Sequence, residues 1–250
     1  MKLALLSDIH ANIHALDACL AHAQAQGAQQ LAFLGDLVGY GAYPSAVMQR
    51  VRALNAQGAL VLKGNHDELA VNPPPEVKTI GDSTAQWTHD QLEESQREFL
   101  SALPMTLQMD KVFLVHASAE APELWRYVYD QNVAALSLDA ASAIEPVRYV
   151  FGGHVHFQSL YYRGTDGSLM KFEPTAEVEV PVSAHRHWLA TIGSVGQPRD
   201  GNPKAMYALF DTDHARLTFH RVAYDHLAAA AAVRAVGLPD YFADRLELGR

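Results

Sequence analysis

Aspartate, asparagine and histidine side chains gather at five places in the chain, each directly behind a short apolar stretch. These places are Ser7-Asp8-Ile9-His10, Gly35-Asp36, Gly64-Asn65-His66-Asp67, Val115-His116 and Gly152-Gly153-His154-Val155-His156. Imidazole, carboxylate and amide oxygen suit borderline divalent cations, whereas the absence of thiolates argues against a structural zinc site. Seven candidate ligands are too many for one tetrahedral ion but suit two ions that share a carboxylate: Asp8, His10, Asp36, Asn65, His116, His154 and His156. The predicted chemistry is metal-assisted in-line displacement.

Two pairs of these candidates are separated by two positions. Residues two apart in an extended segment point the same way. We therefore expect Asp8 with His10, and His154 with His156, each to aim two groups at one centre.

The elements that position these groups alternate in the first part of the chain. An apolar run at 3–6 precedes apolar residues at helical spacing over 13–23, and Gly27 closes that helix. The pattern repeats as a strand at 31–34, a helix opened by Pro44, and a strand at 59–62. Alternating strands and helices predict a parallel sheet, with ligands at the carboxyl ends of its strands.

The later part of the chain is richer in strand signals. After Pro73–Pro75, residues 79–103 are predicted to be helical, and further strands are expected at 105–109, 111–115, 149–151, 158–162, 169–172, 178–182, 187–192, 205–210 and 216–222. An alanine-rich helix at 224–236 precedes a short tail. We expect one domain over residues 1–250, with the segment from about 224 to 250 packing on it.

Composition restricts the class of protein. Apolar residues make up 49% of the chain and charged residues 19%, which predicts a packed globular core. A formal charge of -9 gives no general attraction to nucleic acid or to anionic membranes. The single cysteine, Cys19, excludes an intramolecular disulfide and is expected in the core. With no membrane-length apolar run, and a strand beginning near Met1 where a signal peptide would lie, a cytoplasmic protein is expected; its oligomeric state stays open.

The five blocks in their order, D-x-H, G-D, G-N-H-D/E, H and G-H-x-H, resemble the calcineurin-like metallophosphoesterase superfamily over roughly positions 3 to 200. The resemblance implies an α/β fold, a four-layer αββα sandwich of two mixed sheets flanked by helices. It also implies two divalent ions, from Mn, Fe, Ni or Zn. One is held by Asp8, His10 and His156, the other by Asn65, His116 and His154, and Asp36 bridges them. Residues 35–41 and 193–200 resemble a prokaryotic phosphodiesterase-type branch.

The implied mechanism uses a hydroxide that bridges the two ions as the nucleophile. His66 is then free to protonate the leaving oxygen or to bind a phosphate oxygen, and Asp67 is expected to orient it. Asn65 and Arg199 are candidates for contact with a small phosphoester substrate, for which a nucleotide-like group is one option.

Several alternatives stay open. Protein phosphatases of the superfamily carry Asp and Arg where this chain has Gly39 and Tyr40, which argues against phosphoprotein substrates and leaves a phosphodiesterase as the preferred activity. A phosphomonoesterase, a dinucleoside polyphosphate hydrolase and a non-catalytic metal-binding scaffold are the alternatives. Residues 119–131, with three aromatic side chains, form either core packing or a lid that stacks on a nucleobase. The eight histidines outside the motifs are expected to have ordinary surface or core roles: His14, His22, His89, His185, His187, His214, His220 and His226.

Overall fold

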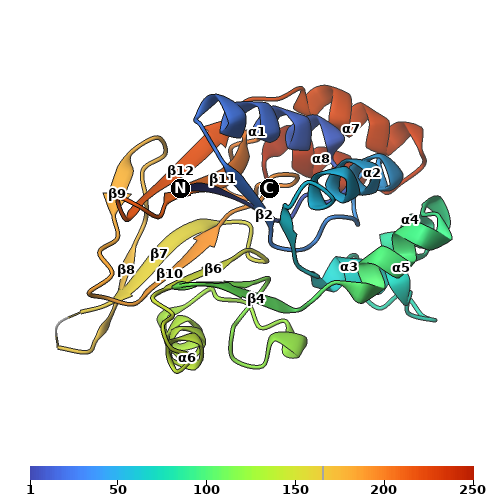
Figure 1. Cartoon of the computed structure of the whole chain (residues 1–250). Helices are drawn as coiled ribbons and strands as arrows, with labels where there is room; N and C mark the ends of the chain where they lie inside the picture. Colours follow the sequence, from blue (N-terminus) through green and yellow to red (C-terminus); the bar gives the residue numbers. More distant parts are fainter. Residues whose placement is uncertain (165) are drawn as a thin grey trace.

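The computed structural model describes residues 1–164 and 166–250, which form two mixed β-sheets with helices on their outer faces (Figure 1). The first sheet contains, in spatial order, β3 (Leu60–Val61), β2 (Gln30–Phe33), β1 (Lys2–Leu6), β11 (Ala205–Asp211), β12 (Arg216–Val222) and β9 (Glu179–Pro181). The second contains β4 (Thr106–Met109), β5 (Val112–Val115), β6 (Tyr149–Gly152), β10 (Trp188–Ile192), β7 (Gln158–Arg163) and β8 (Leu169–Phe172). The predicted αββα sandwich is confirmed.

Helices cover both outer faces of the sandwich. They are α1 (Ile13–Ala25), α2 (Pro44–Asn55), α3 (Asn65–Val71), α4 (Ala85–Gln91), α5 (Glu94–Ala102), α6 (Gln131–Ser142), α7 (His226–Ala235) and α8 (Asp240–Leu248), with short 3-10 turns η1 (Asp82–Thr84) and η2 (Pro122–Leu124). Helix α1 contacts β11 and β12, and α6 contacts β8 and β10. In Figure 1, α1, α2, α7 and α8 therefore lie on one side of the sheets and α6 on the other.

Strand β1 shows how the sandwich is held together. Leu3 and Leu5 are fully buried between the sheets, whereas Ala4 and Leu6 belong to the core on the other face, which includes Cys19 of α1. Successive strand residues point to opposite faces, so an uninterrupted apolar run is what a central strand covered on both sides requires. Burial also raises the pKa of the Cys19 thiol, in agreement with its predicted place in the core.

Two helices were not predicted from the sequence. Asp130 caps the N-terminus of helix α6 by accepting hydrogen bonds from the backbone N–H groups of Asn132 and Val133, and the helix buries Ala134 and Leu138. Helix α3 has only seven residues and begins at Asn65, inside a motif that the sequence placed at a strand end. The predicted helical stretch over 79–103 is divided between η1, α4 and α5 because the backbone is extended at residues 92 and 93.

Parallel strands bring the five motifs to one edge of the sandwich. Strands β1, β2 and β3 are parallel to one another in the first sheet, and β5, β6 and β10 are parallel in the second. Backbone hydrogen bonds join the loops that follow these strands. Val195 N–H donates to the Ser7 carbonyl at 2.9 Å, and Gly153 N–H donates to the His116 carbonyl at 2.8 Å. Both sheets thus contribute to one site. Within the described residues, no helix is long and apolar enough to cross a membrane.

Candidate metal centre

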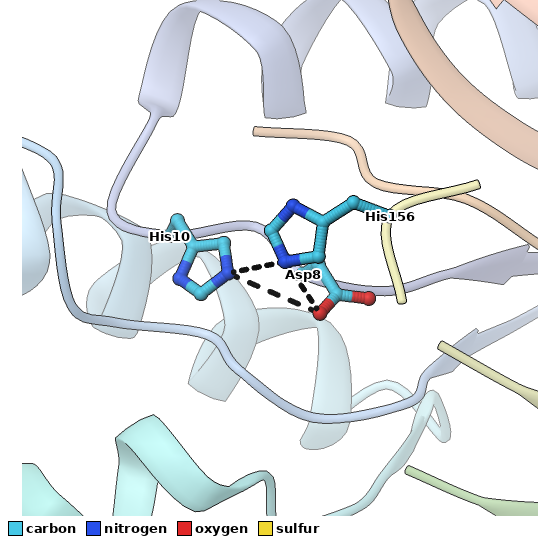
Figure 2. A group of neighbouring side chains, drawn as sticks. All are labelled: Asp8, His10 and His156. Atoms are coloured by element: carbon cyan, nitrogen blue, oxygen red, sulfur yellow. Dashed lines mark hydrogen bonds and ion pairs between the residues drawn. The ribbon is translucent and has the colours of Figure 1, made fainter. Parts of the chain in front are cut away.

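The first group of candidate ligands lies behind β1 and β6. Asp8, His10 and His156 offer ligand atoms that all lie within 4.8 Å of one another, and all three are buried (Figure 2). Nε2 of His156 is 3.2 Å from Oδ1 of Asp8 and 3.1 Å from Nε2 of His10. The backbone N–H of His154 donates to Oδ2 of Asp8 at 2.9 Å. The loop after β6 in the second sheet therefore fixes the Asp8 carboxylate, which follows β1 in the first sheet. We call these three residues the first triad.

The second group lies beside it. Asp36, His116 and His154 also offer ligand atoms within 4.8 Å of one another, and we call them the second triad. Nε2 of His116 is 3.3 Å from Oδ2 of Asp36 and 3.3 Å from Oδ1 of Asn65. The amide oxygen of Asn65 therefore adds a further donor to this group.

Asp36 faces both triads. Its Oδ2 atom lies 3.8 Å from Nε2 of His10 in the first triad and 3.3 Å from Nε2 of His116 in the second. Its Oδ1 atom accepts a hydrogen bond of 2.8 Å from the backbone N–H of His66, which fixes the rotation of the carboxylate. One oxygen is thus left between the two groups of imidazoles.

Each triad histidine is held by a backbone carbonyl at one ring nitrogen. The pairs are His10 Nδ1 with Val38 at 3.3 Å, His116 Nδ1 with Leu34 at 2.7 Å, His156 Nδ1 with Gln197 at 2.6 Å and His154 Nε2 with Trp125 at 2.9 Å. A carbonyl only accepts, so the nitrogen beside it carries the hydrogen and the other nitrogen has a free lone pair. In His10 and His156 these lone-pair nitrogens face each other at 3.1 Å, a repulsive contact that a cation between them relieves. The donor set therefore fits bound divalent ions, with carbonyls fixing the tautomers as metal-binding histidines require.

The backbone in these motifs is not extended as the sequence analysis expected. Positive φ angles occur at Asp8 (54°), His10 (48°), Asp36 (52°), His154 (68°) and His156 (60°). The left-handed region is uncommon for non-glycine residues, and such strain clusters at functional sites. His154 and His156 belong to different triads, so the expectation that both aim at one centre is wrong, whereas Asp8 and His10, which have the same left-handed backbone, share the first triad as expected.

Burial and mutual charge set the protonation of the triads. Burial lowers the pKa of His154 to about 3 and also lowers the pKa of His10 and His156. Burial opposes protonation of His116 as well, but the adjacent Asp36 carboxylate raises the pKa of His116 to about 9. Burial likewise disfavours ionised Asp36, yet His116 and His66 hold its pKa well below the usual range. Ionised carboxylates and neutral imidazoles are the forms that bind metal, so His116 has to lose its extra proton when an ion binds.

A family model described as the calcineurin-like phosphoesterase superfamily domain matches residues 1–215. This chain belongs to that superfamily. An uncharacterised protein of Methanocaldococcus jannaschii is 31% identical over 254 residues, covering 99% of this chain and 98% of its own length. A metallophosphoesterase from Sphaerobacter thermophilus has 32% identity and a TM-score of 0.86, covering 100% of this chain and 99% of its own. A hypothetical protein from Pyrococcus horikoshii has 19% identity and a TM-score of 0.75 over 100% of this chain and 98% of its own, which shows the shared fold.

His66 of this phosphoesterase lies at the edge of the first triad. Its ring is 5.2 Å from the His10 ring and 4.3 Å from the Tyr40 ring, centroid to centroid, and it is buried. The Arg199 guanidinium lies 5.9 Å from the Tyr40 ring centroid and donates to Oε1 of Gln197 at 2.8 Å. Arg199 thus lies over the Tyr40 ring, beside the site.

Asp67 has other partners than the sequence analysis expected. Its Oδ1 atom accepts from the backbone N–H groups of Leu37 at 2.9 Å and Val38 at 3.2 Å, and its Oδ2 atom accepts from Gly64 at 2.8 Å. Among the residues that the structure describes, it makes no hydrogen bond to the His66 ring. Instead of orienting that ring, Asp67 ties the loop after β2 to the start of α3.

The aromatic residues of segment 119–131 lie against the second triad. The Tyr127 ring stacks on the His154 ring with centroids 3.8 Å apart, and Tyr129 stacks on Tyr127 at 5.1 Å. The Trp125 ring meets His116 edge-on at 5.8 Å. Because Tyr127 and Tyr129 are 45% and 54% exposed, core packing is the wrong interpretation for these two rings. Their spacing in the sequence gave no signal of this exposure.

Proposed function

We propose that this chain is a phosphodiesterase with a dinuclear metal centre. Asp8, His10 and His156 would hold one divalent ion, Asn65, His116 and His154 the other, and Asp36 would bridge them. The observation that carries the proposal is the position of Asp36 Oδ2, 3.8 Å from a first-triad nitrogen and 3.3 Å from a second-triad nitrogen. The donor set of imidazole, carboxylate and amide suits Mn, Fe, Ni or Zn.

The chemistry is divided between the ions and the chain. Two divalent ions, when bound by these residues, would acidify a water and neutralise phosphate oxygens. His66, buried against the rings of His10 and Tyr40, supplies the proton for the leaving oxygen. Asp67 keeps the backbone around Asp36 and His66 in place through its three amide contacts. Asn65 and Arg199 are the proposed contacts to the substrate phosphate.

The charge around Tyr40 supports a diester in preference to a monoester. Tyr40 occupies the position of an arginine in protein phosphatases, and its ring packs between His10 at 4.5 Å and Phe242 at 4.8 Å. A phosphomonoester dianion needs more positive charge than a diester monoanion. An uncharged ring at this position therefore costs the monoester more binding free energy.

The exposed tyrosine pair supports a substrate that carries a planar group. The rings of Tyr127 and Tyr129 are nearly parallel, with an interplanar angle of 4°. The Tyr127 ring also stacks on the ring of the triad residue His154. Aromatic side chains of this kind stack on nucleobases without reading sequence. We therefore include a nucleotide-like diester in the proposal.

The decisive test uses chelator-stripped protein reloaded with Mn, Ni, Zn or Mg. Turnover of bis(p-nitrophenyl) phosphate is compared with that of p-nitrophenyl phosphate, in the native chain and in His66→Ala. His185→Ala, which changes an exposed histidine after β9, is the matched control. Faster diester cleavage that depends on metal is expected, with only a small loss in His66→Ala because p-nitrophenolate leaves readily without a proton. Faster monoester cleavage would favour a phosphomonoesterase, and metal-loaded protein without turnover on any generic phosphoester would favour the scaffold.

A further inference from the structure

The ring of His66 is held differently from the rings of the triad histidines. A backbone carbonyl holds one nitrogen of each triad ring. The backbone N–H of His66 donates to Asp36, but within residues 1–164 and 166–250 its ring nitrogens make no hydrogen bond. The residue is 8% exposed, so its neighbours enclose the ring. A proton donor has to stay within hydrogen-bond reach of the oxygen it serves, and packing contacts must therefore orient His66.

Two rings and two glycines lie against His66. The Tyr40 and His10 rings are 4.3 Å and 5.2 Å from the His66 ring, centroid to centroid. A Cβ atom on Gly39 would lie 3.1 Å from Nδ1 of His66, and a Cβ atom on Gly81 would lie 3.6 Å from its Cε1. His10 is a candidate metal ligand, and the glycines offer only backbone. The Tyr40 ring is therefore the side-chain wall of His66 that lies outside the candidate ligands.

The C-terminal hairpin, which we define as α7 and α8, holds the Tyr40 ring in turn. It lies on the side of the sheets that carries α1 and α2 (Figure 1). The Phe242 ring of α8 stacks on the Tyr40 ring with centroids 4.8 Å apart and an interplanar angle of 22°. Phe242 is 2% exposed, in a cluster of buried hairpin residues against which Tyr40 packs. A cavity of about 10 Å³ is lined by both Phe242 and His10, so α8 reaches the surroundings of the first triad.

Polar contacts fasten the two ends of the C-terminal hairpin beside the metal centre. Before α7, the Tyr224 hydroxyl accepts a hydrogen bond of 3.2 Å from Nδ2 of Asn12. After α8, the Gly249 carbonyl accepts a hydrogen bond of 2.7 Å from the backbone N–H of Gly201. The hairpin follows the matched family domain, which ends at residue 215. It is thus fixed relative to the site, as a support for Tyr40 requires.

We propose that Phe242 is a positioning residue for His66 and acts through the stacked ring of Tyr40. The inference rests on the proposed function, in which His66 gives a proton to the leaving oxygen. Phe242 fixes the plane of the Tyr40 ring, and the Tyr40 ring limits the movement of His66. A displacement of about 1 Å can cost a hundredfold in rate. The C-terminal hairpin is therefore part of the active site, although it supplies no candidate metal ligand.

Kinetics with two leaving groups test this role in metal-loaded native chain, Phe242→Leu and Val233→Ala. Methyl phenyl phosphate has a leaving group that needs a proton, whereas methyl p-nitrophenyl phosphate has one that does not. Phe242→Leu should lower kcat about tenfold for the phenyl ester and less than about twofold for the nitrophenyl ester. Val233→Ala changes a buried residue of the same cluster that does not line the cavity beside His10, and it should preserve both rates. Equal losses for the two esters in Phe242→Leu overturn the proposal.

A double variant separates the positioning of His66 from general support of the fold. In a His66→Ala background, Phe242→Leu should not lower the phenyl-ester rate further, because the group that it positions is absent. Tyr40→Leu should show the pattern of Phe242→Leu, and Tyr40→Phe, which keeps the ring, should restore the native ratio of the two rates. A further loss of about tenfold in the double variant contradicts the proposal.

Chemical modification of His66 tests its packing independently of the proposed function. The rate at which diethyl pyrocarbonate modifies His66, followed by peptide mass spectrometry, reports how tightly the ring is enclosed. This rate should rise several-fold in Phe242→Leu and keep its native value in Val233→Ala, with circular dichroism verifying that both variants are folded. An unchanged rate in Phe242→Leu overturns the positioning role even if the native chain cleaves both esters. A raised rate supports it, even if an inactive native chain refutes the phosphodiesterase.

Discussion

The Tyr127 ring lies parallel to the ring of His154, with centroids 3.8 Å apart and an interplanar angle of 18°. The same segment provides the Trp125 carbonyl, which accepts a hydrogen bond of 2.9 Å from Nε2 of His154. One stretch of chain thus fixes the tautomer of a candidate ligand and also covers its face. The half-exposed ring of Tyr129 extends this stack at 5.1 Å from Tyr127.

Replacing Tyr129 by alanine should weaken binding of substrates that carry a nucleobase. Base–aromatic stacking contributes about 1–3 kcal/mol, so KM for thymidine 5′-(p-nitrophenyl phosphate) should rise about tenfold. KM for methyl p-nitrophenyl phosphate, which has the same leaving group and no base, should not change. Tyr241→Ala, at a tyrosine that is 41% exposed on α8, is the control. Equal losses with both substrates would show that Tyr129 acts on the fold and not on the base.

Asp36→Asn should lower activity more than a change at any ligand of one triad alone. The reason is that the Oδ2 atom of Asp36 faces both triads, so an amide at this position weakens both ions at once. A loss of several kcal/mol, about a thousandfold in kcat/KM, is expected. Asp8→Asn is the comparison, and metal analysis accompanies the kinetics. Two full metal equivalents retained in Asp36→Asn would contradict the bridging role.

The effect of His66→Ala should depend on the leaving group. A proton donor matters most when the departing oxygen is strongly basic, and general acid catalysis contributes about 10²–10⁴-fold. We expect a loss of that order for an alkyl or phenyl leaving group and a much smaller loss for p-nitrophenol. Metal content should match that of the native chain. A loss of the same size for every leaving group would place His66 in phosphate binding.

Gly153→Ala should disturb the first triad, whereas the neighbouring change Gly152→Ala should be tolerated better. A Cβ atom on Gly153 would overlap Oγ of Ser7 and Oδ2 of Asp8, while one on Gly152 meets its nearest atom, the Ala117 carbonyl oxygen, at 3.3 Å. Overpacking of this kind costs about 1–3 kcal/mol of unfolding free energy. Thermal unfolding and metal analysis of the two variants check the prediction. Equal metal content in both would mean that Asp8 does not depend on this close approach.

Stability of the metal-free protein should fall on both sides of neutral pH. Burial holds the pKa of folded His154 at about 3, below its ordinary 6.5, so the unfolded chain binds an extra proton between these values and stability falls as pH decreases through 6.5. His116 behaves in the opposite sense: Asp36 outweighs burial and raises its pKa to about 9, so its contribution disappears as pH rises from 6.5 through 9. Each slope approaches about 1.4 kcal/mol per pH unit.

Urea unfolding in the presence of a chelator, repeated across this pH range, measures both slopes. His154→Gln should reduce the slope on the acidic side and leave the alkaline side intact. An acidic slope that is the same in His154→Gln and in the native chain would show that His154 is solvated in the metal-free protein.

The sequence by itself determined many of the strands, the candidate ligands and the order in which they occur, and the sandwich followed from the resemblance that this order carries. Apolar runs such as residues 3–6 mark strands because both faces of a central strand must be buried, and polar side chains directly behind such runs lie at the carboxyl edge of a sheet. Those rules depend only on residues that are close together in the sequence, so the sequence was sufficient to locate these strands and the polar side chains behind them. The short helix α3 was not predicted, because seven residues are too few to show a clear helical periodicity.

Only the tertiary structure decided where the side chains point. His154 and His156 belong to two different triads, whereas Asp8 and His10 share one, and the equal spacing of two residues in both pairs does not reveal this difference. Asp67 accepts hydrogen bonds from backbone amides of the loop after β2, because the fold brings this loop next to the start of α3. His22 and His220 meet because α1 packs across β12, joining residues nearly two hundred positions apart. Such contacts depend on the packing of whole elements, and no local pattern encodes them.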